Sequence, residues 1–223
     1  MTVQGPLGSI LLREGSTTGA VDKFQVTING RGTHAASPQH GADPVVATTA
    51  IIQSLQSVVG RNLDPVLPRV LSVTHIDAGT TWNAIPQSAF FEGTVRTALA
   101  DDRTLAKTVA ERLIHDIAAA YGTTAEINWF FGSPAVINDE HWTQVAEKVV
   151  SNLGLKHIKP DPGIGGEDFS YYLQKAPGVF AHIGAGDAGA GHSPQFAPDP
   201  AGIHYGVAFL TSIALAALDE LHD

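Results

Sequence analysis

Ten histidines stand out in this sequence, because imidazole binds metals and moves protons near neutral pH. His34 lies in a glycine-flanked loop, residues 30–38, between an expected strand and an expected helix. His192 lies in residues 189–194, after an apolar run. Rigid elements often present loop histidines to ligands, so His34 is a candidate ligand contact and His192 a candidate metal ligand. A solvated loop histidine is the simpler alternative for His34.

A complete metal site is not indicated by the residues alone. Zinc needs three or four protein ligands. The only further candidate ligand for a site at His192 is His182, ten residues away, and the pair is a weak indication of a metal site. For His182 the preferred interpretation is a strand residue packed against a sheet.

Three further polar residues could bind a small ligand. The guanidinium of Arg96, on the polar face of an expected strand, is suited to a carboxylate, although a cross-strand ion pair with Glu92 or another acid is the simpler alternative. Asn83 precedes a proline-stabilised turn and could serve only the turn. Glu167 follows two glycines and could face a metal or a substrate amine.

Composition excludes several classes of protein. The chain has 223 residues, 13 Lys and Arg, 22 Asp and Glu, and a net charge of −9. That charge disfavours nucleic acid or an anionic membrane as a partner, because both attract basic surfaces. With no cysteine, a disulfide scaffold, an iron–sulfur cluster and a cysteine nucleophile are all excluded. No signal peptide is recognised, so a soluble, cytoplasmic protein is the default expectation.

The elements that must position these residues alternate in the first half of the chain. Strand and helix periodicities over residues 23–131 follow the order β-α-β-β-α-β, the split βαβ or ferredoxin-like pattern. The expected product is a four-stranded antiparallel sheet with two helices on one face. The apolar residues that define these elements are Val45, Ile52, Leu55 and Val59 on one face of the first helix; Leu105, Val109, Leu113 and Ile117 along the second helix; and Ala125, Ile127, Trp129 and Phe131 on one face of the last strand.

The second half of the chain is expected to be part of a larger α/β domain, because it has too few strands to close a sheet. A helix is expected over residues 139–153, an apolar strand over 178–183, and a last helix from 203. That last helix is expected to carry an apolar stripe made of Ile203, Val207, Leu210, Ala214, Ala217 and Leu221. Its uncharged stretch, residues 205–218, is too short to span a bilayer.

Taken together, these segments resemble the metal-dependent amidohydrolase and carboxypeptidase superfamily, which includes aminoacylases, hippurate hydrolase and plant auxin-conjugate hydrolases. The matching segments occur in family order and with family spacing over nearly the whole chain. They are residues 24–38 (FQVTINGRGTHAASP), 43–44 (DP), 82–86 (WNAIP), 93–97 (GTVRT), 165–172 (GGEDFSYY) and 191–194 (GHSP).

The resemblance implies a role for each candidate. His34 matches the lid histidine that polarises the scissile carbonyl oxygen, often in the active site of the partner subunit. Asn83 and Arg96 match substrate-binding residues, the arginine often holding the substrate carboxylate. His192 matches a metal ligand, and Glu167 an acid close to the site.

The resemblance also implies a domain plan. Residues 1–19 would be a remnant strand of a zinc-peptidase-like catalytic domain, 20–132 an inserted lid or dimerisation domain, and 133–223 the closing part of the catalytic domain. The family's N-terminal half, with the other metal ligands and the water-activating glutamate, has no counterpart here. We therefore expect the chain alone to be inactive or nearly so.

The expected parent activity is hydrolysis of the amide bond of N-acyl amino acids or related conjugates. Its cofactor would be a divalent metal, zinc or manganese, and its partners a small-molecule substrate and a second copy through the lid. Two alternatives stay open: a non-catalytic dimerisation or ligand-binding module that kept the fold, and a ferredoxin-like regulatory domain that binds a metabolite.

Overall fold

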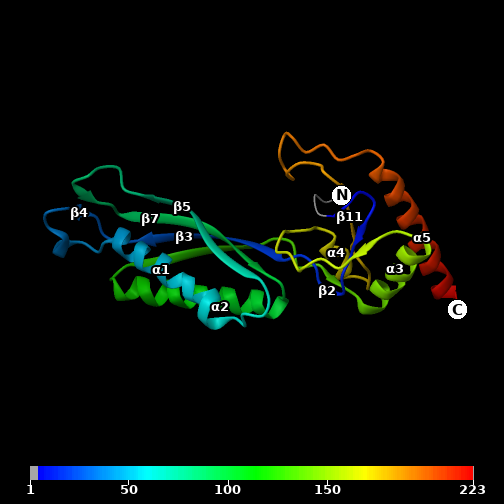
Figure 1. Ribbon diagram of the computed structural model, residues 1–223. Coiled ribbons are helices and arrows are strands. Elements are labelled where there is room, and N and C mark those ends of the chain that lie inside the picture. The colour runs from blue at the N-terminus through cyan, green and yellow to red at the C-terminus, as the bar shows by residue number, and fades with distance from the viewer. Residues whose placement is uncertain (1–4, 223) are drawn as a thin grey trace. The chain divides into compact units, whose positions relative to one another are not determined.

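A computed structural model describes residues 5–222, which form two compact units. One unit, called here the sheet unit, holds Thr18–Ala135 and Gly163–Glu167. The other, called the terminal unit, holds the described residues up to Thr17, Val136–Pro162, and the described residues from Asp168 onward. Figure 1 traces the chain through both units, and each is described by itself.

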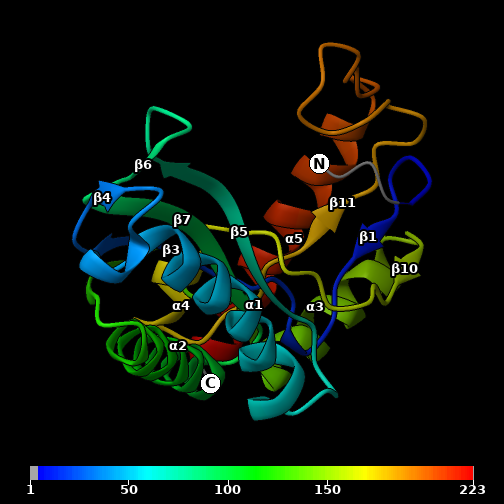
Figure 2. The same ribbon diagram turned by 90° about the vertical axis from the view of Figure 1, so that its left-hand side faces the viewer.

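The sheet unit is a four-stranded antiparallel sheet with two helices on one face. Its strands are β3 (Ala20–Asn29), β5 (Arg69–Ala78), β7 (Ser88–Thr97) and β8 (Thr124–Phe131), in the order β5-β7-β3-β8. Helices α1 (Pro44–Asn62) and α2 (Ala100–Ala120) lie side by side against the sheet (Figure 2). This is the predicted β-α-β-β-α-β arrangement.

The core of the sheet unit follows from alternation along its central strands. Phe24, Val26 and Ile28 of β3 point to the helices and are at most 1% exposed. The ring of Trp129 stacks on Phe24 with centroids 5.7 Å apart. Burial of each such side chain contributes about 1.5–3 kcal/mol, so the helix-facing side of the sheet holds the unit together.

Helix α1 begins where the sequence predicts. The Asp43 carboxylate accepts hydrogen bonds from the backbone N–H groups of Val45 (2.8 Å) and Val46 (3.2 Å), and Pro44 occupies the first helical position. Such a cap stabilises a helix by about 1 kcal/mol.

The apolar faces predicted for three elements are buried only in part. Val45 is 36% exposed and Leu105 43% exposed, because the helices bury neighbouring positions instead. In α1 and α2 the buried residues are Pro44, Ala47, Thr48, Ile51, Leu55 and Val58, and Ala106, Val109, Ala110, Ile114 and Ala118. Phe131 of β8 is 59% exposed, with the Arg103 guanidinium 4.9 Å from its ring centroid.

A buried ion pair fastens the sheet to α2. Asp22 is 1% exposed, and its carboxylate accepts from Nε of Arg103 at 2.9 Å and from Nε1 of Trp129 at 3.1 Å. Arg103 also donates to the carbonyl oxygen of Gly132 at 2.8 Å. With these partners the buried charge is compensated, which its low exposure requires.

An irregularity in β5 changes which side chains face the helices. Val73 pairs with Gly93 and His75 with Glu92, so Thr74 is an extra residue in the ladder, a β-bulge. Before the bulge, Leu71 and Val73 share a face with the core residues of β7. After it, Ile76 pairs with Phe91 on that face, and His75 and Asp77 lie on the open face.

The terminal unit contains short strands and three helices. Strands β1 (Ile10–Leu11), β10 (His157–Ile158) and β11 (His182–Ile183) form one sheet, and β2 (Gly15–Ser16) pairs with β9 (Ile137–Asn138). The helices are α3 (Glu140–Asn152), α4 (Ser170–Leu173) and α5 (Gly202–His222). The strand predicted over residues 178–183 is thus limited to His182–Ile183.

The apolar stripe predicted on α5 is largely exposed. Four of its residues are 59–73% exposed: Ile203, Val207, Leu210 and Leu221. Phe209, by contrast, packs in the core with Ile10 of β1 and with Leu12, which follows β1. Gly202–Leu221 is long and apolar enough to cross a membrane by length and composition alone. The expectation that this segment is too short to span a bilayer, which rested on 14 uncharged residues, therefore underestimated the length of the apolar helix.

Half-buried His182 lies on β11, where it pairs with Leu11, and its ring meets that of Phe180 edge to face at 4.9 Å. Burial lowers the pKa of His182 below its ordinary value. The predicted packing role of this residue is confirmed.

Candidate functional site

His34 and Asn83 are brought together at one end of the sheet unit by two short strands. Strand β4 (Thr33–His34) pairs with β6 (Ala84–Ile85), with His34 opposite Ala84. The backbone N–H of Ala35 donates to the carbonyl oxygen of Asn83 at 3.0 Å. The loops at this end of the sheet are visible beside the label β4 in Figure 1.

The imidazole of His34 is exposed and oriented by its own loop. The backbone N–H of Ala36 donates to Nδ1 of His34 at 3.1 Å. In a neutral imidazole with Nδ1 as acceptor, the proton is on Nε2. His34 therefore presents an Nε2–H donor to solvent, which is the group needed to bind a carbonyl oxygen.

Asn83 is half-buried, and its side-chain oxygen is engaged locally. Its Oδ1 accepts a hydrogen bond from Oγ1 of Thr81 at 3.0 Å. This bond orients the amide and leaves its two N–H groups as donors for a ligand. Trp82, the preceding residue, is 92% exposed.

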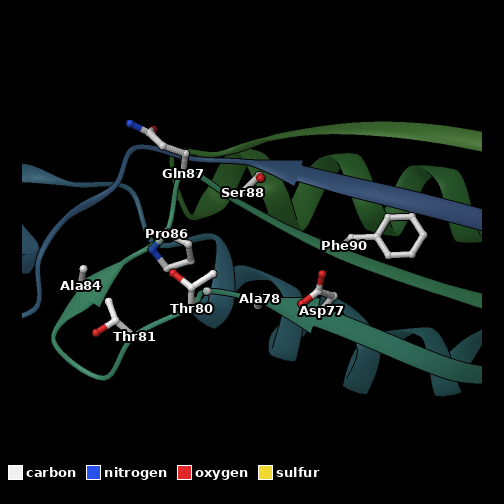
Figure 3. A pocket seen from close by; sticks show the side chains of 10 residues that line it. Asp77, Ala78, Thr80, Thr81, Ala84, Pro86, Gln87, Ser88 and Phe90 are labelled. Atoms are coloured by element: carbon white, nitrogen blue, oxygen red, sulfur yellow. The ribbon is translucent and has the colours of Figure 1, made fainter.

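A hollow of about 400 Å³ opens beside Asn83, between the arms of the β5–β7 hairpin (Figure 3). Its walls include Thr81 and Ala84, which precede and follow the Trp82–Asn83 pair in the sequence. Asp77 and Phe90 also line it. Sequence periodicity did not single out Asp77, because the Thr74 bulge breaks the alternation along β5.

Arg96 lies at the opposite end of β7. It is eight residues from Ser88 along the strand, a distance of about 27 Å at strand rise. Its Nη1 donates to the carbonyl oxygen of Ile164 at 3.2 Å. The alternative of an ion pair with Glu92 is not found within the described chain: Glu92 binds Lys23 at 2.9 Å, and hydrogen bonds from Lys23 and Gln25 lower the pKa of its carboxyl group.

Glu167 belongs to the segment that meets Arg96. The segment Gly163–Glu167 is part of the sheet unit, and the backbone N–H of Gly19 donates to the carbonyl oxygen of Gly165 at 3.0 Å. A Cβ at Gly166 would lie 2.8 Å from Cγ2 of Val21, so glycine permits this close approach. Arg96 and the Glu167 segment thus form a second polar corner, separate from His34 and Asn83.

His192 lies in an exposed loop of the terminal unit and has a left-handed backbone, with φ of 58°. The next side chain holds the loop, because Oγ of Ser193 donates to the carbonyl oxygen of Ala190 at 2.8 Å. Within residues 5–222, no group of three or more His, Asp or Glu could hold a metal ion. The described donor set therefore does not fit a complete metal site.

Comparison with known proteins gives a consistent family. Residues 6–216 match the sequence profile of Peptidase family M20/M25/M40. The chain is similar to the N-acetylcysteine deacetylase of Bacillus subtilis (36% identity over 97% of this chain and 57% of that protein) and to IAA-amino acid hydrolase ILR1-like 2 of Arabidopsis thaliana (34%, 96% and 51%).

A solved structure is similar as well. It is that of a Bacillus subtilis protein described as a dinuclear metal binding peptidase from the M20 family, with a TM-score of 0.83 and 32% identity over 98% of this chain and 55% of that one. The chain spans about half the length of the curated relatives it matches.

Proposed function

The chain belongs to Peptidase family M20/M25/M40, and from that membership we propose that it serves hydrolysis of the amide bond of N-acyl amino acids or related conjugates. The names of its relatives support this substrate class: one is an N-acetylcysteine deacetylase and another an IAA-amino acid hydrolase. The single observation that carries the proposal is the exposed His34 with its Nε2–H held outward by Ala36.

We propose that the residues of this chain bind and polarise the substrate. The Nε2–H of His34 donates to the carbonyl oxygen of the amide as negative charge develops there, which lowers the barrier to attack. The side-chain N–H groups of Asn83 orient the same end of the substrate. Arg96 has no acidic partner in the described chain, so its guanidinium is available for the substrate carboxylate.

The separation of these residues supports a site shared between two copies of the chain. About 27 Å of β7 lies between the His34 corner and Arg96, which is longer than an N-acyl amino acid. A second copy that presents its His34 and Asn83 to the Arg96 of the first would bring all three to one substrate. The sheet unit would then be the lid or dimerisation domain, with the terminal unit as part of the catalytic domain.

The exposed apolar face of α5 supports the proposal that a further polypeptide completes the catalytic domain. Beside Leu210 and Leu221 there is a groove of about 370 Å³, also lined by Trp142 and Val179. Apolar patches of this kind mark interaction surfaces. The helix carries no Lys or Arg, which disfavours an anionic membrane as its cover. A segment equivalent to the remaining half of the relatives is the occupant we propose.

The divalent metal of the reaction would have His192 as one ligand and would act as a Lewis acid. Because the described residues do not complete its site, the remaining ligands and the nucleophile-activating group would come from that further segment. The alternative is a non-catalytic ligand-binding module. The same observation favours it, because no cluster of three or more His, Asp or Glu residues within residues 5–222 could hold a metal ion.

The experiment is an assay of N-acetyl and N-benzoyl amino acids with added zinc or manganese. It uses the chain alone and the chain together with the part of the Bacillus subtilis deacetylase that it does not match, called here the completed protein. We expect turnover only from the completed protein. Turnover by the chain alone would contradict the incomplete site, and substrate binding without turnover in the completed protein would favour the ligand-binding module.

A further inference from the structure

The hollow in the β5–β7 hairpin has the chemistry of a binding site for an organic cation. We propose that it binds a primary ammonium group, and that it gives the proposed hydrolase a preference for substrates whose far end carries an amine. The ammonium site stands on the geometry of the hairpin, whereas the preference among substrates rests on the proposed function.

One carboxylate and one aromatic ring lie next to each other in this hollow. Asp77 and Phe90 are direct cross-strand partners on β5 and β7, so their side chains project from the same, open face of the sheet. Figure 3 shows both at the same end of the hollow. An ammonium group at such a place can form two favourable interactions, an ion pair with the carboxylate and a cation–π interaction with the ring.

The carboxylate of Asp77 is exposed and has no hydrogen bond or ion pair within residues 5–222. The neighbouring histidine on β5 lies beside this site: the ring of His75 meets that of Phe90 edge to face with centroids 5.8 Å apart, and its Nδ1 lies 3.5 Å from the Glu92 carboxylate. The hydroxyls of Thr80 and Ser88 also line the hollow, and they too lack partners within that range. An ammonium group has three N–H donors and needs such acceptors.

Asp77 is the only charged residue in the described lining of this hollow. One carboxylate with hydroxyls is a poor site for a divalent metal, which requires several oxygen ligands at short range. An anionic ligand would meet the Asp77 charge without a compensating cation. A monovalent organic cation of modest size is therefore the ligand that fits both the charge and the volume of about 400 Å³.

The hollow also adjoins the proposed substrate contacts. Thr81 and Ala84, at its other end in Figure 3, flank the segment that carries Asn83. The hydrogen bond from Thr81 to Oδ1 of Asn83 links the wall of the hollow to the orientation of that amide. A ligand held by Asn83 can thus extend along the hairpin toward Asp77.

The test measures binding of small probes to the full chain by NMR titration. The probes are Nα-acetyl-L-lysine, its uncharged analogue Nα-acetyl-L-norleucine, and pentylammonium chloride. We expect acetyl-lysine to bind about fivefold more tightly than acetyl-norleucine, the effect of a partly exposed charge contact with an aromatic neighbour. Amide shifts should be concentrated in residues 77–90.

Asp77→Asn should abolish the preference, whereas Asp116→Asn, which makes the same charge change on the exposed face of α2, should retain it. Equal affinity for the two acetyl amino acids, a preference that survives Asp77→Asn, or no shift in residues 77–90 with millimolar pentylammonium would overturn the proposal.

The two proposals fail in distinguishable ways. If acetyl-norleucine binds through Asn83, as a loss in Asn83→Ala would indicate, but lysine has no advantage, the ammonium site is wrong and the proposed function is unaffected. The other result is that pentylammonium binds in an Asp77-dependent manner, while Asn83→Ala leaves the affinity for the acetyl amino acids unchanged. The ammonium site then stands, and the proposed function loses its support.

Discussion

Nη1 of Arg96 donates a 3.2 Å hydrogen bond to the carbonyl oxygen of Ile164, while Glu92, four residues earlier on the same strand face, binds Lys23 instead. A backbone carbonyl occupies one N–H of the guanidinium and leaves the others for a ligand. The arginine is thus positioned by a segment that also carries Glu167, and its charge is not consumed by a neighbouring acid.

Replacing Arg96 by Lys should weaken substrate binding in the completed protein, because an ammonium cannot form two parallel bonds to a carboxylate. We expect KM for N-acetyl amino acids to rise about tenfold, the value of one charge-assisted hydrogen bond, with a smaller change in kcat. Steady-state kinetics would measure it, with Arg112→Lys on the exposed side of α2 as the control. An unchanged KM in Arg96→Lys would remove the arginine from the substrate site.

His34→Gln should reduce kcat of the completed protein by about 10²–10³ with little change in KM, because a donor to the developing oxyanion is lost. His34 is exposed, so the thermal stability of the chain should not change. His40→Gln, on another exposed histidine of the same loop region, is the control. A fall in stability rather than in kcat would mean that His34 is structural.

Arg103→Ala should destabilise the sheet unit by about 3–5 kcal/mol, because it leaves the carboxylate of Asp22 buried without its cation. Urea denaturation would give the free energy of unfolding. The control is Lys107→Ala, which breaks a surface pair with Glu111 and should cost at most about 0.5 kcal/mol. Equal effects of the two substitutions would contradict the assigned role of the buried pair.

Two glycines should respond to alanine with opposite signs. At Gly93 a Cβ would overlap the carbonyl oxygen of Ser72 and lie 2.6 Å from Cζ of Phe24, so Gly93→Ala should cost about 1–3 kcal/mol. At Gly60, an exposed position in α1, nothing lies within 4 Å of the added atom. Gly60→Ala should therefore stabilise the chain by about 0.5–1 kcal/mol, and matched urea titrations would show whether the signs differ.

Lower pH should destabilise the terminal unit through His182. Because burial lowers the pKa of His182 below 6.5, the unfolded chain takes up this proton at a higher pH than the folded chain does. The stabilising contribution of neutral His182 is therefore fully present above the ordinary histidine pKa of 6.5, and it is lost as the pH falls below that value. His182→Gln should reduce the loss of Tm between about pH 7.5 and about pH 5.5 by about 2 °C, and His40→Gln should not.

The sequence predicts the four main strands of the sheet unit well, because three of them alternate regularly, the fourth, β5, is a β-branched run, and their ends are marked by turns. Faces of helices are harder to predict: Val45 and Leu105 satisfy an apolar periodicity but lie at the flank of the contact between helix and sheet. On α5 the apolar stripe is real, yet Leu210 and Leu221 are exposed. Periodicity identifies an apolar face and does not say which surface covers it.

The candidate site is predictable only in part for a related reason. His34, Asn83 and Arg96 stand in recognisable segments, but no spacing indicates that β7 separates the first two from the third. The role of Asp77 depends on a bulge, and a period of two applied across Arg69–Ala78 assigns it to the wrong face.

That bulge also has a meaning for insertion and deletion in this hairpin. Thr74 is the one residue of β5 that has no counterpart on β7, so its removal would leave Val73 opposite Gly93 and His75 opposite Glu92. A descendant one residue shorter at this point could keep every side chain on its present face, whereas a deletion elsewhere in the strand would transfer one stretch of it to the opposite face. Tolerance to a change of length in the hairpin is therefore concentrated at a single codon.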